Sequence, residues 1–278
     1  MKDKLITVII PVYNGADSIK IAIESIDSNY AEIIIIDDGS TDDTFKVCKE
    51  YEKRYSNVVV YHQENRGPAS AREYGIKKAT GKYIMFLDSD DYYEKGTIAR
   101  MIDIIEKYNE PDLIRFRYKR VPDGQIQNEY FSETEKFVKN ENFKKEVYPM
   151  YLSGYMLNAV WSNCIKREIL AGIQLTDTEK KLKFGEDLIL SLEIFSRIKD
   201  VVFIQDILYR YVYRISSTTH TTDSKKLIQS SKDAIYVYTK LFEYLVKWDM
   251  YNLENVQCIR ERIKKETDDL LDRLKSIT

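Results

Sequence analysis

The residues that most constrain this chain are 83–91, with the sequence YIMFLDSDD. A short, continuous apolar run is typical of a buried strand in a parallel sheet. Because burying three unpaired carboxylates would be very costly, the strand must end where Asp88 begins. In an open α/β sheet, the carboxyl end of a strand is the edge at which ligands bind.

The acidic residues after this run have two interpretations. Hard oxygen ligands on one strand end suit Mg²⁺ or Mn²⁺, and such ions commonly hold phosphates. Asp and Ser are also frequent in turns, so an acidic surface turn is the alternative. This stretch taken alone leaves both open.

Length and composition are those of an ordinary globular protein. The 278 residues allow one large domain or two closely packed halves. The chain is 44% hydrophobic and 32% charged, and its net charge of −2 gives no reason to expect a nucleic acid partner.

Cysteine usage and hydropathy indicate the compartment. Cys48, Cys164 and Cys258 are odd in number and far apart, so we expect free thiols in a reducing compartment. No signal peptide is expected at the N-terminus, and no run approaches the roughly 18 apolar residues of a membrane span. We therefore expect a cytoplasmic protein that at most contacts the inner face of the membrane peripherally.

Strand and helix patterns alternate through the first third of the chain. The apolar runs predict strands at 5–10, 32–36, 58–61 and 83–87. The helical spacing predicts helices at 16–29 and 69–79, and another that Ser40 or Thr41 caps and that continues through Val47 and Tyr51. This alternation indicates a right-handed, parallel α/β sheet with helices on both faces. Each strand ends in polar residues, so we expect Asn14, Asp38 and Asp88 to line one crevice.

Two common phosphate-binding folds lack their signatures here. The turn after the first strand has no Gly-x-Gly-x-x-Gly, which a dinucleotide-binding Rossmann fold would require, and no P-loop is present. Phosphates must be held another way, and a metal on the carboxylate cluster supplies one.

Four ordered segments resemble the family 2 glycosyltransferases of the GT-A fold. They are VIIPVYN at 8–14, DDGSTD at 37–42, Asn65-x-Gly67 with Ala71-Arg72, and FLDSDD at 86–91. The resemblance covers roughly the first 110 residues. It implies an α/β GT-A fold: a Rossmann-like nucleotide-binding half, a mixed, mostly parallel sheet, and a C-terminal helical extension. The implied domains are a GT-A domain over 1–222, divided near 115, and a helical region over 223–278.

The resemblance also implies roles in holding a UDP-sugar donor with Mn²⁺ or Mg²⁺. Asp90 is the expected metal ligand, and Asp88 contacts the ribose or the metal's water. Asp38 accepts a hydrogen bond from uracil, while Arg72 reaches the base or a phosphate. The remaining nucleotide-sugar-binding residues are expected to be Pro11, Val12, Tyr13, Asn14, Asn65, Gly67, Ser89 and Arg214. Ser216 and His220 are expected to close over the diphosphate with Arg214.

An acidic pair opens a later helical pattern. Glu186 and Asp187 follow Gly185 and match the family's Glu-Asp motif, which implies that Asp187 is the general base and that Glu186 orients it or the acceptor. The alternative is structural, because acidic residues favour helix N-termini through the helix dipole.

The rest of the second half yields coarser expectations. We expect a surface excursion over 125–147, and a helix over 148–155 that packs or, alternatively, lines an acceptor groove. Strands are expected at 201–204 and 208–211, and two helices over 223–278.

The residues and the resemblance together predict an inverting enzyme that transfers a hexose from a UDP-sugar to a hydroxyl of a glycan, a lipid-linked acceptor or a glycoprotein. The expected setting is bacterial surface-polysaccharide assembly, and the last helices are expected to pack on the body or on a second subunit. A nucleotidyltransferase and a non-catalytic nucleotide-sugar-binding protein are the rival functions.

Overall fold

The computed structural model describes residues 5–27, 30–126, 131–153, 157–182, 184–213 and 223–275, and the chain forms two compact units. Unit 1 comprises Met1–Phe137, Trp161–Gln174 and Ile198–Val212. Unit 2 comprises Val138–Val160, Leu175–Arg197 and Tyr213–Thr278. The C-terminal helices thus group with residues 175–197, while the domain limits expected near 115 and 222 stay a prediction.

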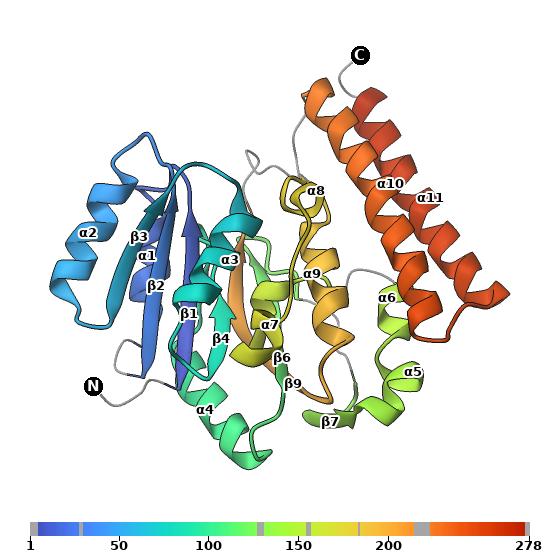
Figure 1. Cartoon of the computed structure of the whole chain (residues 1–278), viewed down its shortest axis with the longest axis horizontal. Helices are drawn as coiled ribbons and strands as arrows, with labels where there is room; N and C mark the ends of the chain where they lie inside the picture. Colours follow the sequence, from blue (N-terminus) through green and yellow to red (C-terminus); the bar gives the residue numbers. More distant parts are fainter. Residues whose placement is uncertain are drawn as a thin grey trace. The chain divides into compact units, whose positions relative to one another are not determined.

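Unit 1 is built on a mixed sheet with strand order β3-β2-β1-β4-β8-β6-β9-β5 (Figure 1). The first four of these strands are parallel, whereas β8 is antiparallel to both β4 and β6, and β5 is antiparallel to β9. The strands are β1 (Ile6–Val12), β2 (Ala31–Asp38), β3 (Val58–Gln63), β4 (Tyr83–Phe86), β5 (Tyr92–Tyr93), β6 (Leu113–Val121), β8 (Asn163–Lys166) and β9 (Asp200–Val212). Another strand, β7 (Glu135–Lys139), crosses the limit between the units.

Helices alternate with the strands of unit 1 as the sequence pattern predicts. They are α1 (Ile19–Glu24), α2 (Thr44–Arg54), α3 (Pro68–Lys78), α4 (Thr97–Lys107) and the short α7 (Arg167–Ala171). The strand interiors are fully buried, as Ile9, Ile34 and Phe86 illustrate. The expected α/β fold with a mixed sheet is confirmed.

The chain leaves β1 toward β2 on one side and reaches β4 on the other, so the strand order reverses beside β1. Such a reversal is where open α/β sheets bind ligands.

Two element predictions in unit 1 need correction. The first helix is shorter than the expected 16–29, because residues 15–18 form a turn in which the Ser18 amide donates to the Gly15 carbonyl. The two strands expected at 201–204 and 208–211 are one strand, β9. Its polar middle is accommodated because Gln205 donates to the Phe131 carbonyl and Asp206 accepts from Arg100.

Apart from the end of β7, the regular elements in the described part of unit 2 are helices. Its α-helices are α5 (Phe143–Glu146), α6 (Pro149–Ser153), α8 (Asp177–Lys180), α9 (Glu186–Phe195), α10 (Ser224–Lys247) and α11 (Leu253–Lys275). Two 3₁₀ turns, at Asn140–Asn142 and Val160–Ser162, complete the assignment. Tyr151 of α6 is fully buried and hydrogen-bonds Ser191 of α9 at 2.7 Å, so this segment packs as a helix rather than lining a groove with that tyrosine.

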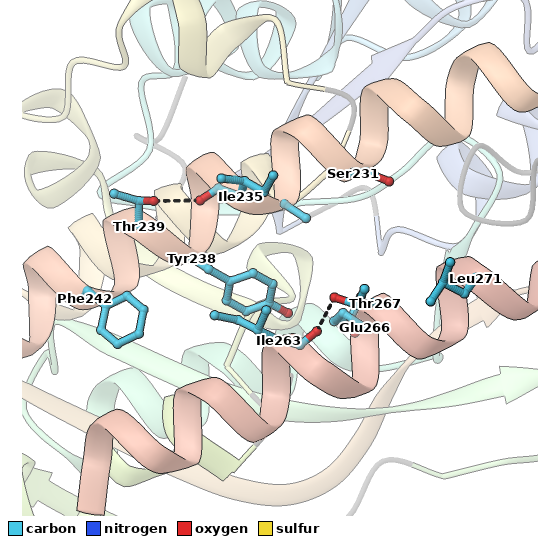
Figure 2. A pocket seen from close by; sticks show the side chains of 10 residues that line it. Ser231, Ile235, Tyr238, Thr239, Phe242, Ile263, Glu266, Thr267 and Leu271 are labelled. Atoms are coloured by element: carbon cyan, nitrogen blue, oxygen red, sulfur yellow. Dashed lines mark hydrogen bonds between the residues drawn. The ribbon is translucent and has the colours of Figure 1, made fainter. Parts of the chain in front are cut away.

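The C-terminal helices α10 and α11 run side by side as a hairpin (Figure 1). A largely apolar groove of about 350 Å³ lies along them (Figure 2). Its apolar lining residues are Ala234, Ile235, Tyr238, Phe242, Ile263 and Leu271. Ile235 remains 72% exposed, so the hairpin does not bury the whole apolar stripe.

Two further observations concern the cysteines and the helices. The three cysteines are free thiols, as expected. In the part of the chain that the structure describes, no helix combines the length and the apolar character needed to cross a membrane.

An ion-pair cluster supports the side of unit 1 that carries α4. Glu135 is mostly buried and accepts hydrogen bonds from Arg100 at 2.9 Å, Lys107 at 2.6 Å and Tyr108 at 2.8 Å. Partial burial alone would raise the pKa of Glu135, but these three donors lower it to about 2.

We predict that Glu135→Gln destabilises the protein at pH 7 by about 1–2 kcal/mol. This is less than the lowering of the Glu135 pKa would imply, because one of its partners, Lys107, is exposed to solvent. The folded state holds the pKa of Glu135 below that of the unfolded chain, so the unfolded state binds more protons as the pH falls from 4.5 toward 2. The wild-type advantage should therefore shrink over that range. Urea unfolding at pH 7 and pH 3 measures it.

Glu50→Gln is the control, because Glu50 is an exposed residue of α2. It should change stability little at either pH. A Glu135→Gln deficit that is the same at both pH values would contradict the assignment.

Candidate functional site

Asn14 joins the loops that follow β1 and β2. Its side-chain oxygen accepts a hydrogen bond from the Thr41 backbone amide at 2.8 Å, and its backbone amide donates to the Ser40 hydroxyl at 3.0 Å. The Gly15 amide adds a bond to the Thr44 hydroxyl at 2.8 Å. These contacts bring the first two predicted motifs together at one sheet edge. They also give Asn14 a structural task besides its predicted role in binding.

Asp38, at the end of β2, organises the loop after β3. One of its oxygens accepts from Gln63 at 2.7 Å and from the Arg66 amide at 2.9 Å, and the other accepts from the Gly67 amide at 2.8 Å. Only 4% of Asp38 is exposed. A carboxylate has about four acceptor positions, so at most one remains for the predicted hydrogen bond from a base. Asp38 therefore fixes the segment Asn65–Gly67 at the same sheet edge.

Asp88 and Arg72 form an ion pair at the end of β4. The Arg72 guanidinium, on α3, donates to Asp88 Oδ1 at 3.0 Å. Arg72 is buried, whereas 28% of the Asp88 side chain is exposed. The sequence predicted both residues for the donor site but did not predict that they pair. The third and fourth motifs are thus joined by a charge-assisted hydrogen bond.

Asp91 is held differently from the other acidic residues of its segment. Its two oxygens accept from the Tyr209 hydroxyl at 2.6 Å and from the Val212 amide at 2.7 Å, and only 2% of the residue is exposed. Burial, together with the nearby Asp88 carboxylate, raises the pKa of Asp91 to about 8. These features make Asp91 a brace for the loop and leave Asp88 and Asp90 as the candidate metal ligands.

The other predicted residues of unit 1 lie around these contacts. Pro11 and Val12 are buried at the end of β1, while half of Tyr13 is exposed and available for stacking. A Cβ atom on Gly15 would lie 3.5 Å from the Ser89 hydroxyl, so the loops after β1 and β4 are neighbours. Asp90 is half-buried beside Ser89.

The chemistry of these side chains suits a divalent cation held jointly with a phosphate ligand. Among the described residues, no three His, Cys, Asp or Glu side chains gather to hold a metal by themselves. Mg²⁺ and similar ions are commonly held by one or two carboxylates, with substrate phosphates and water completing the coordination. Asp88 and Asp90 provide two such carboxylates, so the residues present fit this arrangement.

The predicted base lies in unit 2. Glu186 and Asp187 form the first turn of α9, and both are half-buried. Gly185 is the N-cap of this helix, and its φ is +79°. Glycine adopts this left-handed conformation readily, whereas L-residues adopt it at a cost. A Cβ atom on Gly185 would lie 2.9 Å from Val237 Cγ2 of α10, so the C-terminal hairpin packs directly against the turn that presents the two acids.

Arg214, together with Ser216 and His220, lies outside the described residues, so their expected role stays a prediction. Sequence reasoning missed Tyr209 and Gln63 altogether. Neither belongs to an acidic or glycine-rich motif. Gln63 reaches the site because β3 ends beside β2, and Tyr209 reaches it because β9 pairs with β5, the strand that follows the loop after β4. The only available signal for Tyr209 was its place in the strand pattern at 208–211.

A comparison with protein families shows to which family the chain belongs. The family model described as glycosyl transferase family 2 matches residues 7–161, more than half of the chain. The chain belongs to this family. The expected family is thereby confirmed. The contacts that Asn14, Asp38 and Asp88 make with Thr41, Gly67 and Arg72 fall inside the matched segment, whereas Tyr209 and Val212, which hold Asp91, lie outside it.

A curated relative agrees with this membership. This family 2 glycosyltransferase is 31% identical to the minor teichoic acid biosynthesis protein GgaB of Bacillus subtilis (strain 168), over 82% of this chain and 26% of GgaB. The chain thus spans about a quarter of that relative's length.

Two solved structures share the fold at low identity. TarS 1–349 of S. aureus in complex with UDP-GlcNAc matches with a TM-score of 0.68 and 19% identity, over 98% of this chain and 73% of that one. The mannosyltransferase PcManGT of Pyrobaculum calidifontis, in complex with GDP-Man and Mn²⁺, matches with a TM-score of 0.56 and 16% identity, over 92% of this chain and 72% of that one.

We predict that Gly185→Ala destabilises the protein by about 2–3 kcal/mol, because the left-handed conformation costs roughly 1–2 kcal/mol for an L-residue and the new methyl group meets Val237. Thermal or urea unfolding measures the loss. Adding Val237→Ala should reduce the loss attributable to Gly185→Ala, because it removes the atoms that the methyl group meets.

Gly96→Ala is the matched control. Gly96 also caps a helix, α4, with φ of +85°, but an added Cβ has no neighbour within 4 Å. It should show only the conformational cost. Equal losses at the two glycines would mean that the contact with α10 does not constrain the turn before Glu186.

Proposed function

We propose that this family 2 glycosyltransferase transfers a hexose from a UDP-sugar to a hydroxyl group of a glycan or lipid-linked acceptor, with inversion and with the assistance of a divalent cation. The observation that carries the proposal is the meeting of four motifs at the carboxyl ends of β1, β2 and β4. There Asp38 fixes the Asn65–Gly67 loop and Arg72 pairs with Asp88. This edge is the ligand-binding edge of an open α/β sheet.

A UDP-sugar is the donor class that the relatives favour. TarS, whose fold the chain shares, was solved with UDP-GlcNAc. We propose that Tyr13 stacks on the uracil, that the backbone at Pro11 and Val12 surrounds it, and that Arg72 contacts the base or a phosphate. The remaining acceptor position of Asp38 would take the uracil N–H.

The cation would be held by Asp90, with Asp88 contacting the ribose or a water on the metal. PcManGT, which shares the fold, was solved with Mn²⁺. A bound divalent cation stabilises the charge that grows on the departing diphosphate. Arg72 contributes a second positive charge beside Asp88, and it keeps that carboxylate oriented before the donor binds.

Asp187 is the proposed general base, and Glu186 is proposed to orient it or the acceptor. A carboxylate within hydrogen-bond reach of the acceptor hydroxyl removes its proton as the oxygen attacks the anomeric carbon. In-line attack on the face opposite the diphosphate inverts the configuration, so an α-linked donor yields a β-glycoside and no covalent enzyme intermediate forms.

The name of GgaB supports a role in the assembly of a bacterial cell-surface polymer. We place the reaction in the cytoplasm, at or near the inner face of the membrane. The exposed apolar residues of α10, Ile228, Ile235 and Val246, support contact with a membrane or with a second copy of the chain. Vesicle flotation and sedimentation equilibrium distinguish these two contacts, and a monomer that does not float would refute both.

We predict that UDP-sugars, rather than GDP- or dTDP-sugars, raise the melting temperature in the presence of Mn²⁺, and that EDTA removes the shift. A screen of nucleotide sugars by thermal shift and by donor hydrolysis tests this. A preference for GDP or dTDP would overturn the UDP assignment. A wild-type protein that no nucleotide stabilises would favour a non-catalytic scaffold.

We predict that Asp187→Asn lowers turnover by about 10²–10⁴-fold while leaving UDP-sugar affinity unchanged, because a general base contributes roughly that factor to the chemical step. Single-turnover transfer assays and calorimetric titration with UDP measure the two quantities. The control Asp177→Asn removes an exposed acid from the first turn of α8 and should alter neither. Retained turnover in Asp187→Asn would exclude it as the base.

A further inference from the structure

We propose that Tyr209 is a positioning residue that orients the Asp88–Asp90 segment for cation and donor binding. This inference rests on the proposed function, because it assigns a task in the same site. Tyr209 lies on β9, 118 residues beyond Asp91 in sequence, and it is fully buried. It belongs to none of the four motifs that carry the family resemblance.

The Tyr209 hydroxyl contacts the loop after β4 at two points. It donates to Asp91 Oδ2 at 2.6 Å, and it accepts from the backbone amide of Asp88 at 3.4 Å. One phenol oxygen therefore bridges both ends of the four-residue segment that contains the two proposed metal-binding carboxylates. The segment is also closed on itself, because the Asp91 amide donates to the Asp88 carbonyl at 3.1 Å.

The ring that carries this hydroxyl has little freedom. Trp161 stacks on it with ring centroids 4.3 Å apart and planes at 27°, and Tyr93 meets its edge at 5.7 Å. Both neighbours are buried. Since an aromatic side chain packed on two sides cannot change rotamer without displacing its neighbours, the position of the hydroxyl is set by the sheet.

The other oxygen of Asp91 is also held by β9, through the Val212 amide at 2.7 Å. Asp91 is thus bound on both oxygens by a single strand, and its neighbours Asp88 and Asp90 keep partly exposed side chains. Groups behind metal ligands commonly set the ligands' orientation and, with it, metal affinity. The geometry assigns this task to Tyr209 acting through Asp91 and the Asp88 backbone.

The test compares Tyr209→Phe with Tyr83→Phe. Tyr83 is likewise fully buried, and its hydroxyl donates to the Pro111 carbonyl at 2.8 Å, at the other end of β4. Each variant loses one buried hydroxyl and keeps its ring, so the two should lose similar thermal stability. Binding of Mn²⁺ in the presence of UDP is measured from the free-ion electron paramagnetic resonance signal, and transfer is measured across a Mn²⁺ titration.

We expect Tyr209→Phe to weaken Mn²⁺ binding by roughly 10-fold or more, the usual effect of removing a group that orients a metal ligand. The Mn²⁺ concentration for half-maximal transfer should rise in parallel, while Tyr83→Phe stays within about twofold of the wild type on both measurements. A purely structural role would lower the active fraction at every Mn²⁺ concentration without moving the midpoint.

The outcomes separate the two proposals. If Tyr209→Phe binds Mn²⁺ in the presence of UDP as tightly as the wild type does, and its Mn²⁺ midpoint for transfer is unshifted, the positioning role is overturned and the proposed function stands. A wild-type protein that binds no Mn²⁺ with UDP overturns both. Should Tyr209→Phe fail to fold, Val212→Pro removes the backbone donor to the other Asp91 oxygen and tests whether holding Asp91 sets the Mn²⁺ midpoint. The same midpoint shift is expected, and an unshifted midpoint overturns the positioning role.

Discussion

The high cost of burying an unpaired carboxylate governs unit 1. Strands β2 and β4 run from a fully apolar interior into acidic residues, and each of these residues has to find donors or reach solvent. Asp38 finds them in the backbone of the loop after β3, Asp88 in Arg72, and Asp91 in β9. Satisfying these acids draws segments far apart in sequence to one sheet edge, so the same requirement that stabilises the fold also assembles the candidate donor site.

These carboxylates divide into two groups by their surroundings. Asp38 and Asp91 are nearly inaccessible and have donors on both oxygens, so they fix the backbone around them. Asp88 and Asp90 are partly exposed and belong to the same short segment as Asp91. Identical chemical groups thus serve as anchors or as candidate ligands according to burial, a distinction that residue type and spacing do not contain.

In unit 2 the corresponding constraint is steric. The turn before Glu186 and Asp187 depends on a glycine in the left-handed conformation, and Val237 of α10 fills the space where a side chain would stand. The hairpin also holds α9 through polar contacts, since Tyr244 pairs with Glu193 and the Trp248 indole donates to Ser196 at 2.9 Å. The C-terminal helices therefore support the helix that carries the proposed base, although the sequence presents them as an extension.

The resemblance of four motifs identified the family, and local patterns in the sequence were enough to predict the four parallel strands, the helices between them and the edge where Asn14, Asp38 and Asp88 meet. Those features depend on hydrophobic periodicity and on turn residues, both of which act over a few positions. Only the tertiary structure shows that Arg72 pairs with Asp88, that Tyr209 holds Asp91, and that β9 is one strand. The two contacts join residues up to 118 positions apart. They form because the fold brings α3 to the end of β4 and pairs β9 with β5, the strand after the β4 loop, and no local pattern specifies either arrangement.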